Sequence, residues 1–179
     1  SISAILAFVG VSIGVMVLIL SMAIMNGTAK EFEKKLFTMN YPLTIHPKFS
    51  TISLDQELLN NLQKEFPHLK FSPFISSQAI IQSGETMSGG MIFGVIPQNE
   101  ALINPVYKKA LGDLNLDKFD IITGSGISDK LFLNPGTKTT LYFTELNPTG
   151  FSMMPKMKRF TFANSFTSGL NAYDKAYMY

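Results

Sequence analysis

The fold of this chain is decided at its start, by the stretch ISAILAFVGVSIGVMVLILSMAIM, residues 2–25. No charged residue occurs from Ser1 to Ala29, so all 28 charged side chains (15 basic, 13 acidic) fall after it. A helix of about 20 apolar residues crosses the ~30 Å hydrocarbon core of a bilayer. The run exceeds the roughly 7–15 apolar residues of a signal peptide and lacks its basic start. Because so short a chain cannot bury this helix on every side, the sequence predicts a transmembrane helix over residues 1–28.

Two patterns in and after this helix predict how it packs against other helices and how far it extends beyond the membrane. Gly10 and Gly14 are four residues apart, a spacing that lets another membrane helix approach closely, although it is also common by chance. Phe32 and Leu36 then lie four apart between mixed charges, which predicts a juxtamembrane extension of the helix over residues 29–40. Residues 41–179 are expected to form one outer domain, incomplete at its C-terminus.

The composition excludes several functional classes. Charged residues make up 16% of the chain, against a typical share of about 25%. The net charge of +2 is too small for the basic stripe of a nucleic-acid-binding domain, so no nucleic-acid partner is expected. The chain has no Cys, which excludes disulfides, thiolate metal sites and Cys nucleophiles.

A search for catalytic and metal-binding patterns finds none that would support an enzyme. His46 and His68 are isolated, without a metal-ligand spacing. The run GSGIS, residues 124–128, is not a nucleophile elbow, because its glycines and serines stand in the wrong order. Since no nucleophile and base can be paired, we expect neither catalysis nor a cofactor or metal.

The outer domain mixes expected strands and helices without regular alternation, which favours an α+β class. A helix is predicted with Ser53 as its cap and Pro67 as its end. The segments 69–83 and 87–96 should form a hairpin around Gly84-Glu85. A tight strand-to-helix turn is expected at 124–126 and a chain turn at 134–136. Further strands are expected at 42–46, 119–122, 138–143, 158–166 and 172–179, and a short helix at 127–133.

One segment, ELNPTGFSMMPKMKR at residues 145–159, is unusual for a loop between strands. It combines three Met and one Phe with three cations. Exposed Met suits surfaces that accept varied partners, so the loop could dock an apolar pocket with an acidic rim. Alternatively, its apolar side chains fold back onto the domain core, and composition favours neither reading.

Several short motifs closely resemble the lipoprotein-releasing permeases of the LolC/LolE type. The first membrane helix of that family is similar to VGVSIGVM at residues 9–16, MNG at 25–27, Phe32 and Leu36. The resemblance continues through GVIP at 94–97, ITG at 122–124, Leu131, Gly136, MPKMKRF at 154–160 and FTSG at 166–169. It covers essentially the whole chain, although residues 48–85 match only in general character.

The resemblance implies a fold and a function. Such permeases have four membrane helices, with a large MacB-like periplasmic domain of porter and sabre parts between the first two. They sit in the bacterial inner membrane beside a second permease copy or paralogue, and a cytoplasmic ABC ATPase subunit hydrolyses ATP for them. The complex extracts lipoproteins from the membrane and passes them to the soluble periplasmic carrier LolA. We therefore expect this chain to be a fragment that does not transport on its own.

The resemblance also assigns roles to residues. A protruding hairpin, the hook, captures the carrier in the LolC type, and the matching positions are Pro148, Gly150, Phe151, Met153, Met154 and Pro155. The neighbouring pad corresponds to Met157, Lys158 and Arg159. Gly150-Phe151 replaces the Pro-Met pair of the family tip, so Phe151 is expected to supply the apolar anchor. Candidates for the lipid-binding cavity are Met22, Met25 and Asn26, and for helix packing Gly10 and Gly14.

Other functions stay open at this stage. An exporter or regulator of the MacB or FtsX type would share the fold, although the Met/Pro hairpin argues against it. A pilin also begins with an exposed apolar helix, but pilins normally carry Glu near position five, where this chain has Ile5. A membrane-anchored sensor would need a second helix leading to a signalling domain. LolC, LolE and merged single-permease versions share the motifs quoted above, so the motifs do not separate them.

Overall fold

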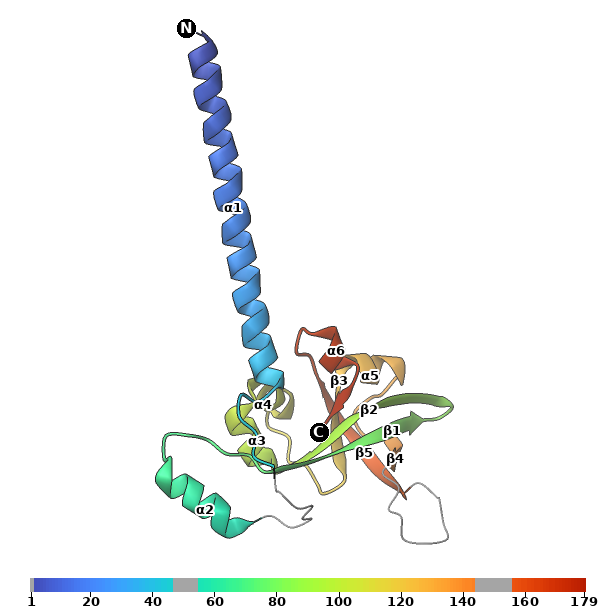
Figure 1. Ribbon diagram of the computed structural model, residues 1–179. Coiled ribbons are helices and arrows are strands. Elements are labelled where there is room, and N and C mark those ends of the chain that lie inside the picture. Colours follow the sequence, from blue (N-terminus) through green and yellow to red (C-terminus); the bar gives the residue numbers. More distant parts are fainter. Residues whose placement is uncertain (1, 47–54, 144–155) are drawn as a thin grey trace. The chain divides into compact units, whose positions relative to one another are not determined.

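The computed structural model describes residues 2–46, 55–143 and 156–179 (Figure 1). The chain divides into two compact units, Ser1–Asn40 and Tyr41–Tyr179, which are described separately below. The first is a helix and the second mixes strands with short helices, so the predicted α+β class is confirmed.

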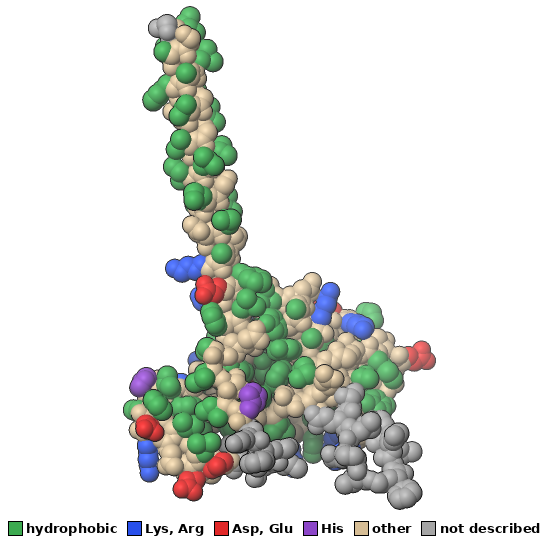
Figure 2. Space-filling model, in the orientation of Figure 1, with side chains coloured by type: hydrophobic (Ala, Val, Ile, Leu, Met, Phe, Trp, Pro, Cys, Tyr) green, Lys and Arg blue, Asp and Glu red, His purple; other side chains and the backbone are tan. Residues whose placement is uncertain are grey.

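The first unit is one continuous helix, α1 (Ile2–Met39), which includes both the predicted membrane segment and its extension. In the described part of the chain, it is the one helix long and apolar enough to cross a membrane. Figure 2 shows hydrophobic side chains along its visible face, with charged groups only toward its C-terminal end. The hydroxyls of Ser12 and Thr28 donate to the carbonyls of Phe8 and Ile24, at 2.8 and 2.9 Å. These bonds satisfy the hydroxyls within the helix, as an apolar environment requires.

The second unit is built on a closed six-stranded barrel with the strand order β1-β2-β6-β3-β5-β4. The strands β2 and β6 pair in parallel, as do β3 and β5, and the other neighbours are antiparallel. The strand bounds are β1 Phe74–Ser83, β2 Thr86–Val95, β3 Asp120–Gly124, β4 Lys138–Phe143, β5 Lys156–Phe166 and β6 Tyr177–Met178.

Alternation along the strands fills the barrel. Ile81 of β1 pairs directly with Leu141 of β4, and both side chains are completely buried. Residues on either side of each point outward, as the two-residue period of a strand requires. The core cluster comprises Ala79, Ile81, Ile92, Ile121, Ile127, Leu131, Leu133, Leu141, Phe162 and Met178.

The predicted hairpin of β1 and β2 is confirmed. Ser83 pairs with Thr86, which leaves the two-residue turn Gly84-Glu85. Gly84 has φ of 57°, a conformation that glycine adopts without steric cost and that a two-residue hairpin turn needs at its first position.

The predicted tight turn between β3 and the next helix is also present, and it explains the glycine at its first position. A Cβ on Gly124 would collide with the backbone carbonyl of Asp174. Helix α5 (Ser125–Lys130) starts directly after Gly124. It begins two residues before the predicted start at 127 and ends three residues before the predicted end at 133.

Other helices differ from the sequence expectations. Ser53 lies outside the described residues, and Asp55 caps α2 (Gln56–Glu65) by accepting from the Leu58 amide at 2.9 Å. Helices α3 (Pro97–Ile103) and α4 (Pro105–Leu111) were not predicted, because a Pro at the first helical position looks like a chain break.

The predicted strand at 42–46 is wrong, and the one predicted at 172–179 is present only at Tyr177–Met178. Residues 42–46 carry no regular structure. The segment 172–179 instead forms most of the short helix α6 (Asn171–Asp174), which is followed by β6. The Asp174 carboxylate accepts hydrogen bonds from both the amide and the hydroxyl of Ser168, at 2.7 Å each, and these bonds close a turn before β6.

Candidate functional site

The residues assigned to the hook lie outside the part of the chain that the structure describes. They are Pro148, Gly150, Phe151, Met153, Met154 and Pro155. The strand ends on either side are described: Phe143, the last residue of β4, pairs with Lys156, the first residue of β5. The surface beside these two strand ends is therefore the candidate functional site.

The pad residues Met157, Lys158 and Arg159 occupy consecutive positions of β5, and the structure places them on two different faces. Lys158 pairs with Leu141, whose side chain points into the barrel. Directly paired residues share a face and their sequence neighbours take the opposite one. Lys158 therefore lies on the inner face, at the end of the barrel, while Met157 and Arg159 lie on the outer face.

Lys158 is held at the barrel end by an aromatic ring. Its ammonium nitrogen lies 4.3 Å from the centroid of the Phe119 ring, and this ring packs edge-on against Phe160 at 5.9 Å. A cation over an aromatic face within about 6 Å is attracted by the ring quadrupole. The charge of Lys158 thus has an aromatic partner at the exposed end of the barrel, since Lys158 is exposed and Phe119 is 39% exposed, whereas Arg159 lies on the other face.

The outer face of β2, β1, β4 and β5 forms a continuous surface, hereafter the outer sheet face. One row across it joins Gly89, Ile80, Tyr142 and Met157, which pair in this order from β2 to β5. The next row joins Met87, Gln82, Thr140 and Arg159. The Tyr142 hydroxyl donates to Gln82 Oε1 at 2.8 Å and so links the two rows.

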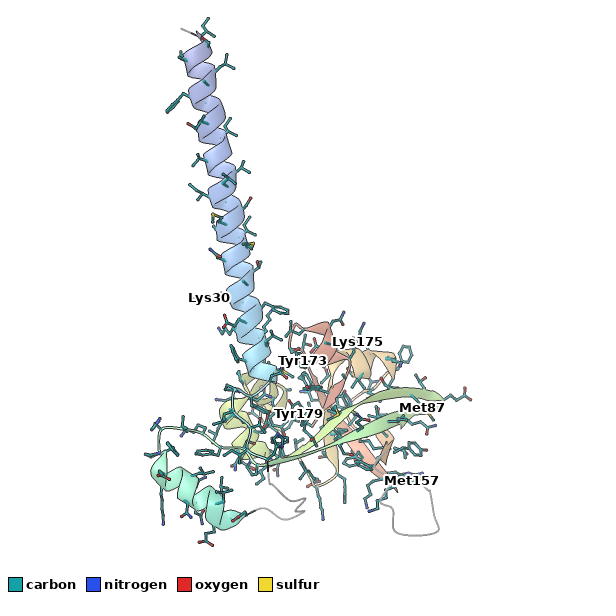
Figure 3. The ribbon with its side chains drawn as sticks, viewed as in Figure 1. Lys30, Met87, Met157, Tyr173, Lys175 and Tyr179 are labelled. Atoms are coloured by element: carbon teal, nitrogen blue, oxygen red, sulfur yellow. The ribbon has the colours of Figure 1, made fainter. Side chains whose placement is uncertain are left out.

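The outer sheet face combines apolar side chains with a cation. Met157 is 68% exposed, and Met87 and Ile80 are also exposed. Figure 3 labels Met157 at the start of β5 and Met87 on the β1–β2 hairpin. Arg159 lies in the same row as Met87, so a partner that touches this face meets both apolar and cationic groups.

The residues of α1 that were expected to bind lipid or to pack against another helix are all exposed in the first unit. Met22, Met25 and Asn26 are spaced three and four residues apart and therefore share one side of the helix. Gly10 and Gly14 also share a side, and a Cβ added to either meets nothing within 4 Å. Both sets are open to a partner helix or to lipid.

A buried polar network in the second unit was missed from the sequence. Glu100 of α3 is completely buried, and its carboxylate accepts from the hydroxyls of Tyr41 and Ser72, the latter at 2.9 Å. Asn104 Nδ2 donates to Glu100 Oε1 at 3.1 Å and to the Tyr179 hydroxyl at 3.3 Å. The sequence gives little signal for this network, because a Glu in the first turn of a helix usually faces solvent.

Burial changes the acidity of the tyrosines around Glu100. Removal from water, reinforced by the Glu100 charge, raises the pKa of Tyr107 to about 12. Burial likewise raises the pKa of Tyr41 and of Tyr179 far above that of free tyrosine. These hydroxyls stay protonated at neutral pH and so remain donors.

The described ranges contain no group of three or more His, Asp or Glu side chains that could hold a metal ion. His46 and His68 both lie on exposed chain, one in the segment after α1 and one after α2.

Comparisons with known proteins place the chain among relatives that share both of its units. Residues 4–173 match the family of the MacB-like periplasmic core domain. The lipoprotein-releasing system transmembrane protein LolC of Xylella fastidiosa (strain Temecula1) is 25% identical over 173 residues, covering 94% of this chain and 42% of that protein. LolC of Buchnera aphidicola subsp. Acyrthosiphon pisum is 30% identical over 166 residues, with coverages of 92% and 41%. LolE of Haemophilus influenzae is 27% identical over 151 residues, with coverages of 78% and 35%.

The resemblance predicted from the sequence motifs is confirmed by these matches. The chain spans about two-fifths of the length of the first of these relatives.

Proposed function

Because the chain belongs to the family of the MacB-like periplasmic core domain, we propose that it is part of a permease subunit that extracts lipoproteins from the bacterial inner membrane. The observation that carries this proposal is the extent of the similarity. It runs through the membrane helix and the barrel unit together, over 94% of the chain in a relative named as a lipoprotein-releasing system protein. A soluble periplasmic carrier of the LolA type would then receive the lipoprotein from the barrel unit.

The proposal includes further partners. A cytoplasmic ABC ATPase subunit supplies the energy, and a second permease copy or paralogue completes the path through the membrane. The relatives include both LolC and LolE proteins, which supports a paired arrangement. Met22, Met25 and Asn26 on α1 contact the acyl chains of the lipoprotein, and Gly10 and Gly14 pack against a neighbouring membrane helix.

The outer sheet face and the hook residues form the proposed docking surface for the carrier. Apolar Met157, Ile80 and Met87 supply contact area, and flexible thioethers adapt to a partner surface. Arg159 adds a cation, which fits a carrier surface with an acidic rim. Lys158 does not belong to this surface in the proposal, because its charge is engaged with Phe119 on the inner face.

Depletion of the full-length protein in cells tests the transport proposal. Outer-membrane lipoproteins should accumulate in the inner-membrane fraction, while an unlipidated outer-membrane protein still reaches its destination. Normal sorting of lipoproteins after depletion would contradict the proposal and would favour an exporter or regulator of the MacB or FtsX type.

A photocrosslinking amino acid tests the docking surface. Placed at Met157 or Phe151 of the full-length protein, it should capture the soluble carrier in cells. Leu102 on α3 is a matched control, because it is also an exposed apolar residue but lies on a helix away from β5. Equal capture of the carrier at Leu102, or no capture at Met157 and Phe151, would contradict the proposal that this surface binds the carrier.

A further inference from the structure

The methionines of the second unit are sorted between the two faces of the barrel wall. The structure describes Met87, Met91, Met157 and Met178 there. Met178 of β6 belongs to the core cluster and is completely buried. Met87 and Met157 lie on the outer sheet face, and Met91 shares it, because it follows Gly89 by two residues on β2. Every described methionine of this unit outside the core therefore lies on the face that the carrier is proposed to contact.

Exposure of these side chains to solvent is graded. Met157 is 68% exposed and Met87 is 49% exposed, whereas Met91 is half-buried opposite Tyr177 of β6. Figure 3 labels Met157 on β5 and Met87 on the β1–β2 hairpin, so the two lie on different strands of the face. A thioether needs no deprotonation to react, so access of the reagent decides which sulfur is oxidised first. The expected order is Met157, Met87, Met91 and then Met178.

A two-electron oxidant such as hydrogen peroxide converts methionine to methionine sulfoxide. The sulfur loses two electrons, one peroxide oxygen forms the new S–O bond, and the other leaves as water when the O–O bond breaks. Methionine sulfoxide reductases reverse the step, because two thiols supply the electrons, form a disulfide and release the oxygen as water. The chain has no Cys that would compete for the oxidant.

The sulfoxide changes the docking face without altering the core. It replaces an apolar, flexible thioether with a polar group that accepts hydrogen bonds. When a partner covers that group without donating to it, the lost hydration weakens binding. Met87 and Met157 lie outside the core cluster, so the barrel keeps its packing when they are oxidised. The affinity for a partner changes, whereas the fold does not.

We infer that Met87 and Met157 form a reversible oxidation site, and that their sulfoxides lower the affinity of this protein for the carrier. The inference rests on the proposed docking surface and adds its regulation by a peroxide. Under oxidising conditions the transfer of lipoprotein to the carrier slows, and reduction of the sulfoxides restores it. Arg159 shares the face but is not altered by the oxidant, so the change concerns the apolar contacts alone.

The test treats the full-length protein in detergent with hydrogen peroxide and follows each methionine by peptide mass spectrometry. Sulfoxide should form first at Met157 and Met87, while Met178 stays reduced in the folded protein. Binding of a purified LolA-type carrier is measured before and after oxidation. The dissociation constant should rise roughly tenfold, the scale of one buried polar group left without a partner, and the thermal midpoint should stay unchanged. Treatment with reductases for both sulfoxide epimers should restore the original value.

Two variants identify the methionines that are responsible, and each is compared with its own affinity before oxidation. Met87→Leu combined with Met157→Leu keeps apolar side chains of similar volume and removes both sulfur atoms. Its dissociation constant should change less than about twofold on oxidation. Met16→Leu removes an exposed methionine of α1 instead, and oxidation should weaken its binding as much as that of the wild type.

The same loss of affinity in the double variant and in the wild type would overturn the inference, since other residues would then carry the effect. Unchanged affinity after complete conversion of Met87 and Met157 to sulfoxides would also overturn it, as would a loss that the reductases do not reverse. Failure of the reduced wild-type protein to bind the carrier is a different result, and it would reject the proposed docking surface itself.

Discussion

Replacing Phe132 with glycine should stabilise the barrel unit. Phe132 follows α5 with φ of 52°, and it is the one residue other than glycine with positive φ in the described part of the chain. Its amide donates to the Asp129 carbonyl at 3.3 Å, and the next amide, of Leu133, donates to the Ser128 carbonyl at 2.9 Å. These two bonds form a Schellman motif, in which glycine is the usual residue at the left-handed position.

The expected gain follows from the backbone and from the exposure of the ring. The left-handed conformation costs a residue with a Cβ roughly 1–2 kcal/mol. Glycine avoids this cost but loses more backbone freedom on folding, roughly 0.5–1 kcal/mol relative to alanine. The Phe132 side chain is 83% exposed, so little packing is lost. The net prediction is a gain of about 1 kcal/mol, which raises the thermal midpoint of a unit of this size by roughly 3 °C.

Calorimetry of the full chain in detergent measures this change in thermal midpoint. The method suits this protein because it needs no Trp fluorescence, and the chain has no Trp. The control is Phe132→Ala, which removes the ring but keeps a Cβ in the left-handed conformation and should leave the midpoint nearly unchanged. If the glycine variant were no more stable than the alanine variant, the backbone argument would be refuted. If both variants were less stable than the wild type, the Phe132 ring would be shown to make a stabilising contact.

Three further outcomes are expected. Leu141→Ala, at the centre of the barrel, should lower the free energy of unfolding by about 2–5 kcal/mol in urea titrations, since it leaves a cavity beside Ile81. A loss below about 1 kcal/mol would show that the barrel closes around the cavity. Gly124→Ala should reduce the yield of folded protein, because its Cβ meets the Asp174 carbonyl, and a wild-type midpoint would contradict this close approach. The stability contributed by neutral Tyr107 is fully present below pH 10, the pKa of free tyrosine, and is lost as the pH rises toward its folded pKa of about 12. The absorbance change from ionisation of Tyr41, Tyr107 and Tyr179 should therefore come late and together with unfolding. Ionisation of these three tyrosines near pH 10 in folded protein would contradict the burial argument.

The parts of the fold that local sequence determines were predictable. Helix α1 follows from an uninterrupted apolar run, and the hairpin follows from alternation around Gly84. Strand β4 occupies the predicted residues, because its buried and exposed positions alternate. Closure of the barrel was not predictable, since it depends on β6, a strand of two residues that pairs with β2 and β3 from distant parts of the chain.

The candidate site shows the same division. The sequence located the pad as a segment but placed Lys158 in one group with Met157 and Arg159. In a strand, neighbouring residues point to opposite faces, so Lys158 lies on a different face from the other two. The Glu100 network depends on residues more than 100 positions apart along the chain, from Tyr41 to Tyr179, and no local pattern connects them.

The measurement that tests the central proposal most directly is lipoprotein release from proteoliposomes containing the full-length protein and its ATPase partner. Fluorescent lipoprotein should move to the soluble fraction when both ATP and the periplasmic carrier are present, and Arg159→Glu should lower the transfer to the carrier. Transfer that needs neither ATP nor carrier, or no transfer under any condition, would contradict the assignment of this chain to a lipoprotein-releasing permease.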